Sequence, residues 1–333
     1  MSRSRLSLAL ETGAVTIPAN GQVAVMRPRA DADLSALPRA RVLIIQGFRP
    51  DHDAWAARGY ACAVAAEGRH AATLVCVPRA KAEARALIAE AVALTDGPVI
   101  VDGQKTDGID SLLKECRQRA DVSMPISRAH GKLFSLHAAD PAAFADWEAA
   151  PVDGPAGFRT MPGVFSADGI DRGSALLADT LPAHLKGRVA DLGAGWGYLA
   201  AEVLKRKEVT QVHLIEAEHA ALQCARQNIT DPRARFHWAD ATRFTPEDPF
   251  DVIVTNPPFH TGRTADHALG QAFLTAAARM LAPSGQLWLV ANRHLPYERP
   301  LAQLFRDVAE VAGDTGFKVL TARAPLRRQS RQR

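Results

Sequence analysis

The stretch RVADLGAGWGYLAAEVLKRK (188–207) decides the fold of this chain. It begins as a short apolar strand, carries glycines at 193, 195 and 197, and continues in a helical pattern. A strand that enters a helix through such a turn is typical of a doubly wound α/β domain, and the glycines let a ligand approach the backbone at the carboxyl edge of the sheet. The third glycine comes one residue earlier than in the nicotinamide pattern G-x-G-x-x-G, and no P-loop Gly-Lys-Ser/Thr is present. The segment predicts a ligand site and disfavours nucleoside-triphosphate hydrolysis.

Around this turn, strands alternate with helices through the second half of the chain. The helical patterns between the strands are about 10–15 residues long, which indicates βαβ units and a mainly parallel sheet. The expected elements are a strand and turn at 188–195, strands at 211–218, 234–240, 251–256, 286–292 and 317–323, and helices at 197–207, 220–229 and 268–281.

The first half of the chain is a faint copy of the second. The order strand, helix, strand in 73–105 parallels the order in 251–293, but the copy has no glycine-rich turn. Its strand ends in Pro78-Arg79, where the second half has Asn-Pro-Pro-Phe. We therefore expect two tandem Rossmann-like α/β domains, the first of them degenerate. The expected domains are 1–145 and 156–333, with an Ala-, Pro- and Asp-rich linker at 139–157.

The composition is that of a globular protein, with 47% hydrophobic and 23% charged residues. No run of about 18 apolar residues is present, so a membrane span is not expected, and the N-terminus is a poor secretory signal. The cysteines show neither C-x-x-C spacing nor a metal-site pattern, so we expect reduced thiols, no metal site and a cytoplasmic location. The four cysteines are Cys62, Cys76, Cys116 and Cys224.

The net charge of +4 comes from the C-terminal end. Basic and acidic side chains are equal in number over residues 1–155, whereas the segment from Lys318 to Arg333 has basic residues and no acidic ones. Such a tail can contact phosphates at close range, and it can equally be a solvated terminus. The charge alone does not identify a nucleic-acid partner.

Two acidic residues follow the next strands along the chain. Glu216 ends the strand 211–218 and can accept hydrogen bonds from the two hydroxyls of a ribose, or alternatively complement a helix dipole. Asp240 follows the third strand and can accept a hydrogen bond from an adenine amino group, or alternatively cap a turn. Together with the glycine turn, these residues predict an adenosine-containing cofactor that needs no pyrophosphate. S-adenosylmethionine fits this description.

The fourth strand ends in Asn256-Pro257-Pro258-Phe259, and two prolines forbid continued sheet pairing. The Asn256 side-chain oxygen and the Pro257 carbonyl can each accept one hydrogen of a planar amine. This directs the nitrogen lone pair at the methyl group and stabilises the positive charge that develops on the nitrogen. Phe259 can stack on a base. The motif therefore predicts methylation of an exocyclic amine.

On these residues the second half resembles the class I S-adenosylmethionine-dependent methyltransferases that carry the Asn-Pro-Pro-Phe/Tyr signature. The whole chain is similar to the bacterial small-subunit ribosomal RNA guanine-N2 methyltransferases and their large-subunit relatives. The stretches that carry this similarity are QGFRPDHDAW (46–55), SRAHGKLFSL (127–136), GVFSADGIDRGSALLADTLP (163–182), DLGAGWGYLA (191–200), TNPPFHTG (255–262) and VANRHLPYE (290–298).

The resemblance implies tandem methyltransferase-like domains, of which only the second, 156–333, binds the cofactor, while 1–145 serves structure or RNA docking. It implies target contacts from Asn256, Pro257 and Phe259. It also implies that Phe165 and Asp168 lie in a segment that covers the cofactor. The implied cofactor contacts are Asp191, Gly193, Gly195, Glu216 and Asp240. His260 and Asn292-Arg293-His294 border the implied pocket, for RNA contact or for packing.

The function implied is methylation of a guanine N2 amine in 16S ribosomal RNA, with the small ribosomal subunit as partner. A monomer suffices, because one chain supplies both domains. Guanine-N2 methylation of 23S ribosomal RNA, adenine-N6 methylation and protein glutamine methylation remain alternatives within this chemistry. A nicotinamide-dependent oxidoreductase and a non-catalytic ribosome-assembly factor are alternatives of other classes. Trp196, inside the glycine turn, departs from the small residues often seen there.

Overall fold

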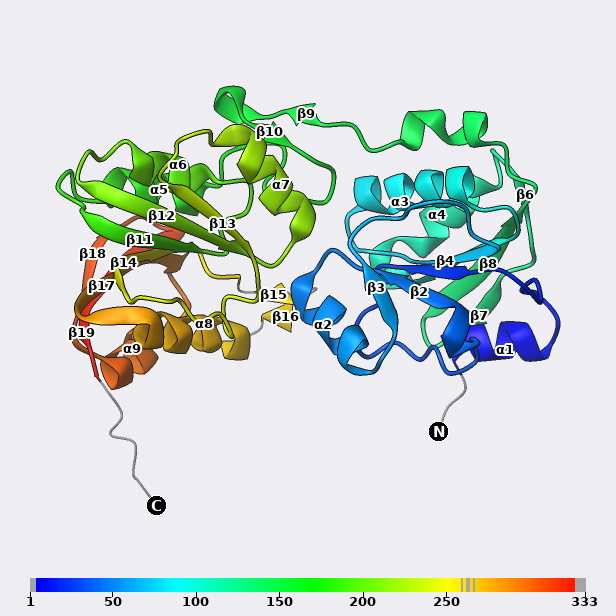
Figure 1. Cartoon of the computed structure of the whole chain (residues 1–333), viewed down its shortest axis with the longest axis horizontal. Coiled ribbons are helices and arrows are strands. Elements are labelled where there is room, and N and C mark those ends of the chain that lie inside the picture. The colour runs from blue at the N-terminus through cyan, green and yellow to red at the C-terminus, as the bar shows by residue number, and fades with distance from the viewer. Residues whose placement is uncertain (1–3, 259, 262–263, 266, 327–333) are drawn as a thin grey trace, which may run out of the picture. The chain divides into compact units, whose positions relative to one another are not determined.

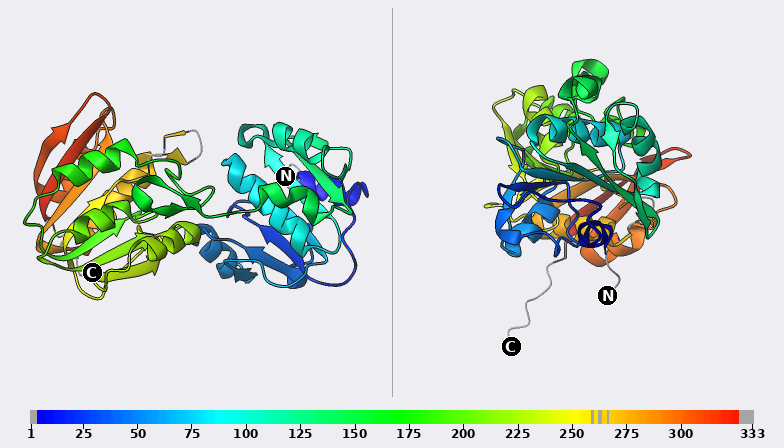
Figure 2. Two further views of the ribbon diagram at one scale, coloured as in Figure 1. Left: turned by 90° about the horizontal axis from the view of Figure 1, so that it is seen from above. Right: turned by 90° about the vertical axis from the view of Figure 1, so that its right-hand side faces the viewer.

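The computed structural model describes residues 4–258, 260–261, 264–265 and 267–326 (Figure 1). The chain divides into two compact units. The first unit comprises Met1–Pro151 with Met161–Gly163, and the second comprises Val152–Thr160 with Val164–Arg333. Each unit contains one large mixed sheet with helices on both faces (Figure 2). The predicted α/β class with tandem Rossmann-like domains is confirmed.

The sheet of the second unit has the strand order β13-β12-β11-β14-β17-β19-β18. The first five of these strands pair in parallel, and β19 and β18 complete the sheet in antiparallel pairing. The strands are β11 (Gly187–Leu192), β12 (Val209–Glu216), β13 (Ala234–Trp238), β14 (Phe250–Thr255), β17 (Leu281–Asn292), β18 (Phe305–Gly313) and β19 (Phe317–Pro325). Short pairs are formed by β9 (Val152–Asp153) with β10 (Arg159–Thr160), and by β15 (His260–Thr261) with β16 (Thr264–Ala265).

The inner strands are apolar on both faces because helices cover both faces. Val189 of β11 packs with the helices of one face, and its neighbour Ala190 packs with those of the other. The first face is covered by α5 (Arg172–Thr180), α6 (Tyr198–Leu204) and α7 (His219–Asn228), and the second by α8 (His267–Met280) and α9 (Glu298–Leu304) (Figure 1).

The first unit repeats this topology, with the strand order β3-β2-β1-β4-β5-β8-β6. Its first five strands are parallel, and β8 pairs antiparallel with β5, β6 and β7. The predicted duplication is therefore confirmed at the level of strand order. The strands are β1 (Val23–Met26), β2 (Val42–Ile45), β3 (Ala61–Ala63), β4 (Ala72–Cys76), β5 (Val99–Gln104), β6 (Asp121–Val122), β7 (Ile126–Arg128) and β8 (Gly131–His137).

Helices also cover both faces of the first sheet. Buried side chains of α3 and α4 form one core, and those of α1 and α2 form the other. The helices are α1 (Arg5–Glu11), α2 (Arg49–Ala57), α3 (Lys81–Leu94) and α4 (Ile109–Cys116), with short 3-10 turns η1 (Arg39–Arg41), η2 (Lys105–Asp107), η3 (Pro141–Trp147) and, in the second unit, η4 (Pro155–Gly157).

The two sheets have equivalent backbone hydrogen bonds at the carboxyl ends of β11 and β12 in the second unit and of β1 and β2 in the first. In the second unit, the Gly193 N–H donates to the Ile215 carbonyl at 2.9 Å, and in the first the Arg27 N–H donates to the Ile45 carbonyl at 2.8 Å. The residue after Ile215 is Glu216, whereas the residue after Ile45 is Gln46. We call this strand end, at Gln46 in the first unit and at Glu216 in the second, the corner. The first unit thus keeps the backbone conformation of the corner but has an amide side chain in place of a carboxylate.

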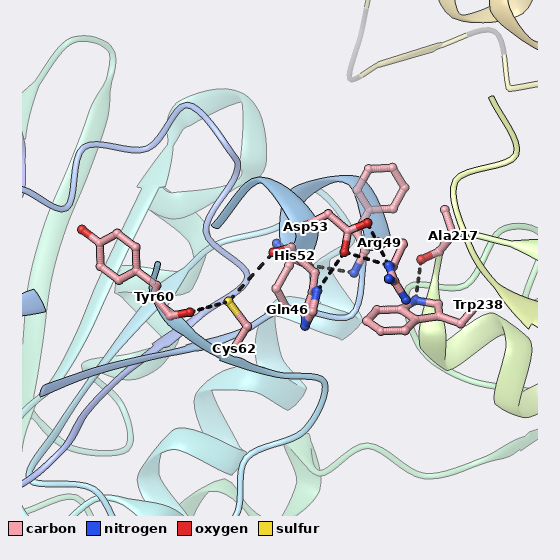
Figure 3. Close-up of polar contacts among 9 residues, drawn as sticks. Gln46, Arg49, His52, Asp53, Tyr60, Cys62, Ala217 and Trp238 are labelled. Atoms are coloured by element: carbon pink, nitrogen blue, oxygen red, sulfur yellow. Dashed lines mark hydrogen bonds and ion pairs between the residues drawn. The ribbon is translucent and has the colours of Figure 1, made fainter. Parts of the chain in front are cut away.

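The next helix of the first unit, α2, begins beside this corner. Arg49 and Asp53 form an ion pair at 2.8 Å across one turn of the helix (Figure 3). The Cys62 thiol of β3 donates to the carbonyl oxygens of Tyr60 at 3.5 Å and His52 at 3.9 Å, which ties β3 to the helix (Figure 3).

Two expectations about the chain's organisation need correction. Residues 139–157 are not a simple linker, because η3 lies within them and its Phe144 and Trp147 are buried in the core of the first unit. Lys318, which the sequence placed in a basic tail, is buried in β19 and pairs with Glu298 at 2.5 Å. The tail from Arg327 onward lies outside the described residues.

Among the residues described, no helix combines the length and apolar character that spanning a bilayer would need. Within the same residues, no group of three or more His, Cys, Asp or Glu is placed to hold a metal ion.

Candidate active site

The glycine turn joins β11 to α6 in a conformation that side chains rarely adopt. Gly193, Gly195 and Gly197 have φ angles of 73°, 56° and 95°. A Cβ at Gly197 would lie 2.9 Å from Ile229 Cδ1, so a larger residue would be strained by this φ and would also displace the Ile229 side chain at the end of α7. A Cβ at Gly195 would meet no atom within 4 Å. The turn therefore has open space beside Gly195, where a ligand can approach the backbone.

Glu216 is held against this turn by backbone donors. The Gly195 N–H donates to Oε2 at 2.8 Å, and the Glu218 N–H donates to Oε1 at 2.7 Å. Burial raises the pKa of Glu216, and these two N–H groups offset part of that shift. Each oxygen keeps a second lone pair, so the carboxylate can still accept hydrogen bonds from neighbouring hydroxyls of a ligand.

Asp191 is fully buried at the end of β11. Neither of its carboxylate oxygens has a hydrogen bond of normal geometry from the described residues, although the Ala200 N–H is near enough to stabilise the charge slightly. Burial and then the negative charge of Glu216 raise the pKa of Asp191 to about 8. A buried carboxylate without partners is destabilising unless a ligand compensates it.

Asp240 lies in the turn after β13. Its Oδ1 accepts hydrogen bonds from the Thr242 N–H at 2.8 Å and the Thr242 hydroxyl at 2.6 Å. Its Oδ2 is 3.9 Å from Arg243 Nε. The turn-capping role that the sequence left open is thus present, and an adenine contact by Asp240 stays a prediction.

Asn256 is placed by β14, whose Thr255 hydroxyl donates to the Leu192 carbonyl at 2.7 Å. The amide nitrogen of Asn256 donates to Asp171 Oδ2 at 2.9 Å and to Ser174 Oγ at 2.9 Å. The amide oxygen Oδ1 is buried and has no hydrogen-bond partner among the described residues. Both N–H groups of this side chain are therefore used by the protein, and its acceptor is left for something else.

One cleft brings several of these residues together. Of the residues predicted from sequence, Phe165, Gly193, Gly195 and Asn256 line it. Ser166, Asp171, Ser174, Ala194, Trp196, Tyr198 and Leu199 complete its lining. Asp191, Glu216 and Asp240 lie outside this lining, Pro257 is buried, and Asp168 is exposed. Phe259 lies outside the described residues, so its predicted stacking role is not addressed by the structure.

The chain is similar to a known protein family and to known proteins. The model of the family "Methyltransferase small domain" matches residues 155–321. A ribosomal RNA small subunit methyltransferase C of Alteromonas mediterranea is 30% identical over 270 residues, which cover 78% of this chain and 75% of that protein. The protein of the same name from Klebsiella pneumoniae is 33% identical over 251 residues, covering 73% and 72%.

The chain belongs to the ribosomal RNA small subunit methyltransferase C family.

A solved structure of this family supports the same assignment over both units. The T. thermophilus 16S rRNA N2 G1207 methyltransferase (RsmC), in complex with AdoMet and guanosine, matches with a TM-score of 0.76 and 25% sequence identity. The match covers 96% of this chain and 92% of that chain. The resemblance drawn from the sequence motifs is thereby confirmed.

The residues of this family member fit S-adenosylmethionine as judged from their own geometry. The cleft is open beside Gly195, Glu216 presents carboxylate lone pairs next to it, and the buried carboxyl group of Asp191 has no hydrogen-bond partner among the described residues. Such a set suits a ligand with hydroxyl donors, and a positive charge on that ligand would stabilise the ionised form of Asp191. The cofactor of methyltransferases has both.

The sequence reasoning missed the role of Trp196. Its ring is buried and contacts Phe158 and Tyr198, with ring centroids 4.9 Å and 5.8 Å away, and its indole N–H donates to the Phe165 carbonyl at 3.1 Å. Asn228 of α7 adds to this, because its amide bonds the backbone of both Trp196 and Arg159. The large residue inside the glycine turn thus anchors the segment that lines the cleft.

Asp171 and Ser174 were also missed as site residues. Their signal was present in GIDRGSALL (169–177), where Asp171 comes just before an apolar helical pattern and so predicts a helix N-cap. The sequence does not show that this helix start faces the end of β14.

Proposed function

We propose that this chain transfers the methyl group of S-adenosylmethionine to the exocyclic N2 amine of a guanine in 16S ribosomal RNA. The observation that carries the proposal is the amide oxygen of Asn256, which is buried and has no hydrogen-bond partner among the described residues. Asn256 is one of the residues that line the cleft beside the glycine turn. An acceptor left unpaired in this way costs about 1–3 kcal/mol. A donor on the substrate relieves that cost.

The chemistry follows from the charge that develops on the amine. S-adenosylmethionine supplies an electrophilic methyl group attached to a positively charged sulfur. As the new N–C bond forms, the bond from the methyl carbon to sulfur breaks and its electron pair would stay on sulfur, so the positive charge passes to the guanine nitrogen and its hydrogens become stronger donors. Asn256 Oδ1, which has no hydrogen-bond partner among the described residues, is proposed to accept one of them, and the Pro257 carbonyl to accept the other. These contacts strengthen in the transition state, so they accelerate the transfer itself.

After transfer, the amine releases one proton and keeps the methyl group. A strong base is not needed at the moment of transfer, because the proton becomes acidic only once the bond to carbon exists. A guanine inside a helix cannot reach such a pocket, so the base must leave its stack. Phe259 is proposed to stack on the base, and Phe165, whose side chain is 63% exposed, to cover the cofactor together with Asp168.

The cofactor contacts are proposed for Asp191, Gly193, Gly195, Glu216 and Asp240. The catalytic domain is proposed to be 156–333, and 1–145 a degenerate domain that serves structure or RNA docking. We further propose that the enzyme acts in the cytoplasm on the small ribosomal subunit, and as a monomer. The presence of AdoMet and guanosine in the T. thermophilus structure, and the name of the curated relatives, support the substrate class.

The test is transfer of labelled methyl groups from S-adenosylmethionine to purified small subunits, large subunits, protein-free ribosomal RNA and a glutamine-bearing protein extract. We expect N2-methylguanosine in small-subunit RNA from the wild type. Asn256→Ala should lower kcat on the order of 10²- to 10³-fold, the loss seen when a transition-state hydrogen bond is removed. Asn20→Ala, at an exposed asparagine outside the cleft, is the matched control and should leave the rate unchanged.

Label found only in large-subunit RNA would support the same methyl-transfer mechanism, with 23S instead of 16S ribosomal RNA as the substrate. Label only in protein, or none in any RNA, would refute the ribosomal proposal.

A further inference from the structure

We propose that Asp171 is a positioning residue for methyl transfer, which acts through Asn256 by fixing the orientation of its amide and by polarising it. This inference rests on the proposed function for its kinetic consequence. Its geometric part is the hydrogen bond by which Asp171 fixes the Asn256 amide, which we call the hold of Asp171 on Asn256. This part rests on the structure alone.

The identity of the partner fixes the direction of the amide. A carboxylate oxygen only accepts hydrogen bonds, so the group of Asn256 that lies 2.9 Å from Asp171 Oδ2 must be the NH₂ and not the carbonyl. Ser174 Oγ, also 2.9 Å from the same nitrogen, takes the second N–H. With both hydrogens committed, Oδ1 is the group that remains for the substrate.

Asp171 is itself held in place by the helix that it starts. It is the N-cap of α5, and its Oδ2 accepts the Ser174 N–H at 2.8 Å. Residue 173 is a glycine, and a Cβ there would lie 3.1 Å from Asp171 Oδ2 and 3.0 Å from the ring of Phe317. The φ of Gly173 is not in the left-handed region, so the glycine is explained by the space that the Phe317 ring and the Asp171 carboxylate together occupy.

The charge of Asp171 adds to the orientation. A hydrogen bond from an amide N–H to a carboxylate is charge-assisted, and it draws electron density within the amide toward Oδ1. Oδ1 then becomes a stronger acceptor for an amine that gains positive charge. Two hydrogen bonds in series thus connect Asp171 to the reacting nitrogen. The first joins the carboxylate to the Asn256 NH₂, and the second is the proposed bond from the amine to Asn256 Oδ1.

A purely structural role makes a different prediction, because Asp171 also caps α5. Asn and Ser are both good N-cap residues, so Asp171→Asn and Asp171→Ser keep the helix start. Asn at this position can still accept from Asn256 but carries no charge, and Ser is too short to reach it. Capping alone therefore predicts that both variants equal the wild type.

Our inference predicts a graded loss. We expect kcat to fall about tenfold in Asp171→Asn and about 100-fold in Asp171→Ser, with KM values for RNA and cofactor within about twofold of wild type. Asp140→Ser is the matched control, because Asp140 caps η3 through the Ala142 N–H and should show no loss. Wild-type kcat in both Asp171 variants would overturn the inference.

A double-mutant cycle shows whether Asp171 acts through Asn256. In an Asn256→Ala background, Asp171→Ser should cause no further loss, because the amide that it orients is absent. A further loss of the same size as in the wild-type background would overturn the inference.

The hold itself is tested without catalysis. The side-chain amide resonances of Asn256, identified by their absence in Asn256→Ala with selective ¹⁵N-asparagine labelling, should shift in Asp171→Ser and not in Asp140→Ser. Unshifted resonances would refute the inference whatever the enzyme methylates. Shifted resonances together with no labelled RNA would refute the proposed function and leave the hold established.

Discussion

Asp191 is proposed to contact the cofactor, but its burial costs free energy of folding when the carboxyl group is ionised. The carboxylate is buried, and its pKa is raised to about 8, first by burial and then by the charge of Glu216. The unfolded chain would lose this proton near pH 3.8, whereas the folded protein keeps it up to about pH 8. The folded state therefore binds more protons between these values, and the free energy of unfolding falls as the pH rises through this window.

Asp191→Asn removes this dependence while keeping the size of the side chain. We expect the melting temperature of the wild type to fall more between pH 5 and pH 8 than that of the variant, and the variant to be the more stable protein at pH 8. Thermal unfolding in both buffers measures this, with the exposed Asp121→Asn as control. Parallel pH profiles for wild type and Asp191→Asn would show that Asp191 is ionised in the folded protein.

Single residues of the site were predictable where a motif carries them, and not where only the fold brings them together. The glycine turn, Glu216 and Asn256 each follow a strand, so the common edge of a parallel sheet predicts their proximity. Asp171 lies 85 positions before Asn256, and no local pattern connects the two. A helix start seen in sequence does not reveal which strand end it faces.

At the scale of the element, Trp196 connects the glycine turn to the segment that lines the cleft. Its indole N–H donates to the Phe165 carbonyl, so Trp196→Phe keeps the ring and removes one hydrogen bond. Such a bond contributes a net 0.5–1.5 kcal/mol, which corresponds to about two- to tenfold weaker cofactor binding. We expect this loss in the Kd for S-adenosylmethionine by calorimetry, with kcat at saturation little changed.

The matched control is Trp288→Phe, because this buried tryptophan of β17 donates to Gln286 within its own strand. An unchanged Kd in Trp196→Phe, or an equal loss in the control, would contradict the anchoring role.

Which elements the sequence revealed depends on their burial. The helix expected at 268–281 is α8, and the helix expected between the two strands of 73–105 is α3, because both carry continuous helical patterns. The edge strand β18 has one fully buried residue, Phe305, so its sequence shows no alternation to detect. Helix α2 likewise buries only Trp55 and begins at Arg49-Pro50, which makes its amphipathic pattern weak.

At the scale of the whole molecule, the two halves share a topology but have different residues at the positions of the candidate site. Arg27 has a φ of 58° at the position that Gly193 occupies in the second unit, and its guanidinium pairs with Glu83 at 2.9 Å. Gln46 is buried where Glu216 stands, and its amide nitrogen donates to the Pro28 carbonyl at 2.9 Å. By strand register, Cys76 takes the place of Asn256. The sequence shows this difference in residue types without coordinates, and loss of cofactor binding by the first unit stays a prediction.

We therefore expect one molecule of S-adenosylmethionine per chain. The first unit has the uncharged Gln46 where the second has Glu216, and the amide of Gln46 is already bonded to the Pro28 carbonyl and the Phe48 N–H. Calorimetry should give a stoichiometry of one for the wild type, and no measurable binding for Glu216→Ala, whose first unit is intact. Residual stoichiometric binding in that variant would show that the first unit also takes the cofactor.

The corner at Gln46 also explains how half of a duplicated enzyme could change without unfolding. Gln46 Oε1 accepts the Phe48 N–H at 2.9 Å, just as Glu216 Oε1 accepts the Glu218 N–H at 2.7 Å, and both following helices begin from backbone angles of −87° and 113°. The hydrogen bond from the backbone N–H at the helix start needs only a side-chain oxygen as acceptor, which an amide and a carboxylate both provide. The hydroxyls of a ribose bind more strongly to a charged carboxylate. An amide therefore serves as well as a carboxylate for the fold at this position, and only ligand binding distinguishes the two.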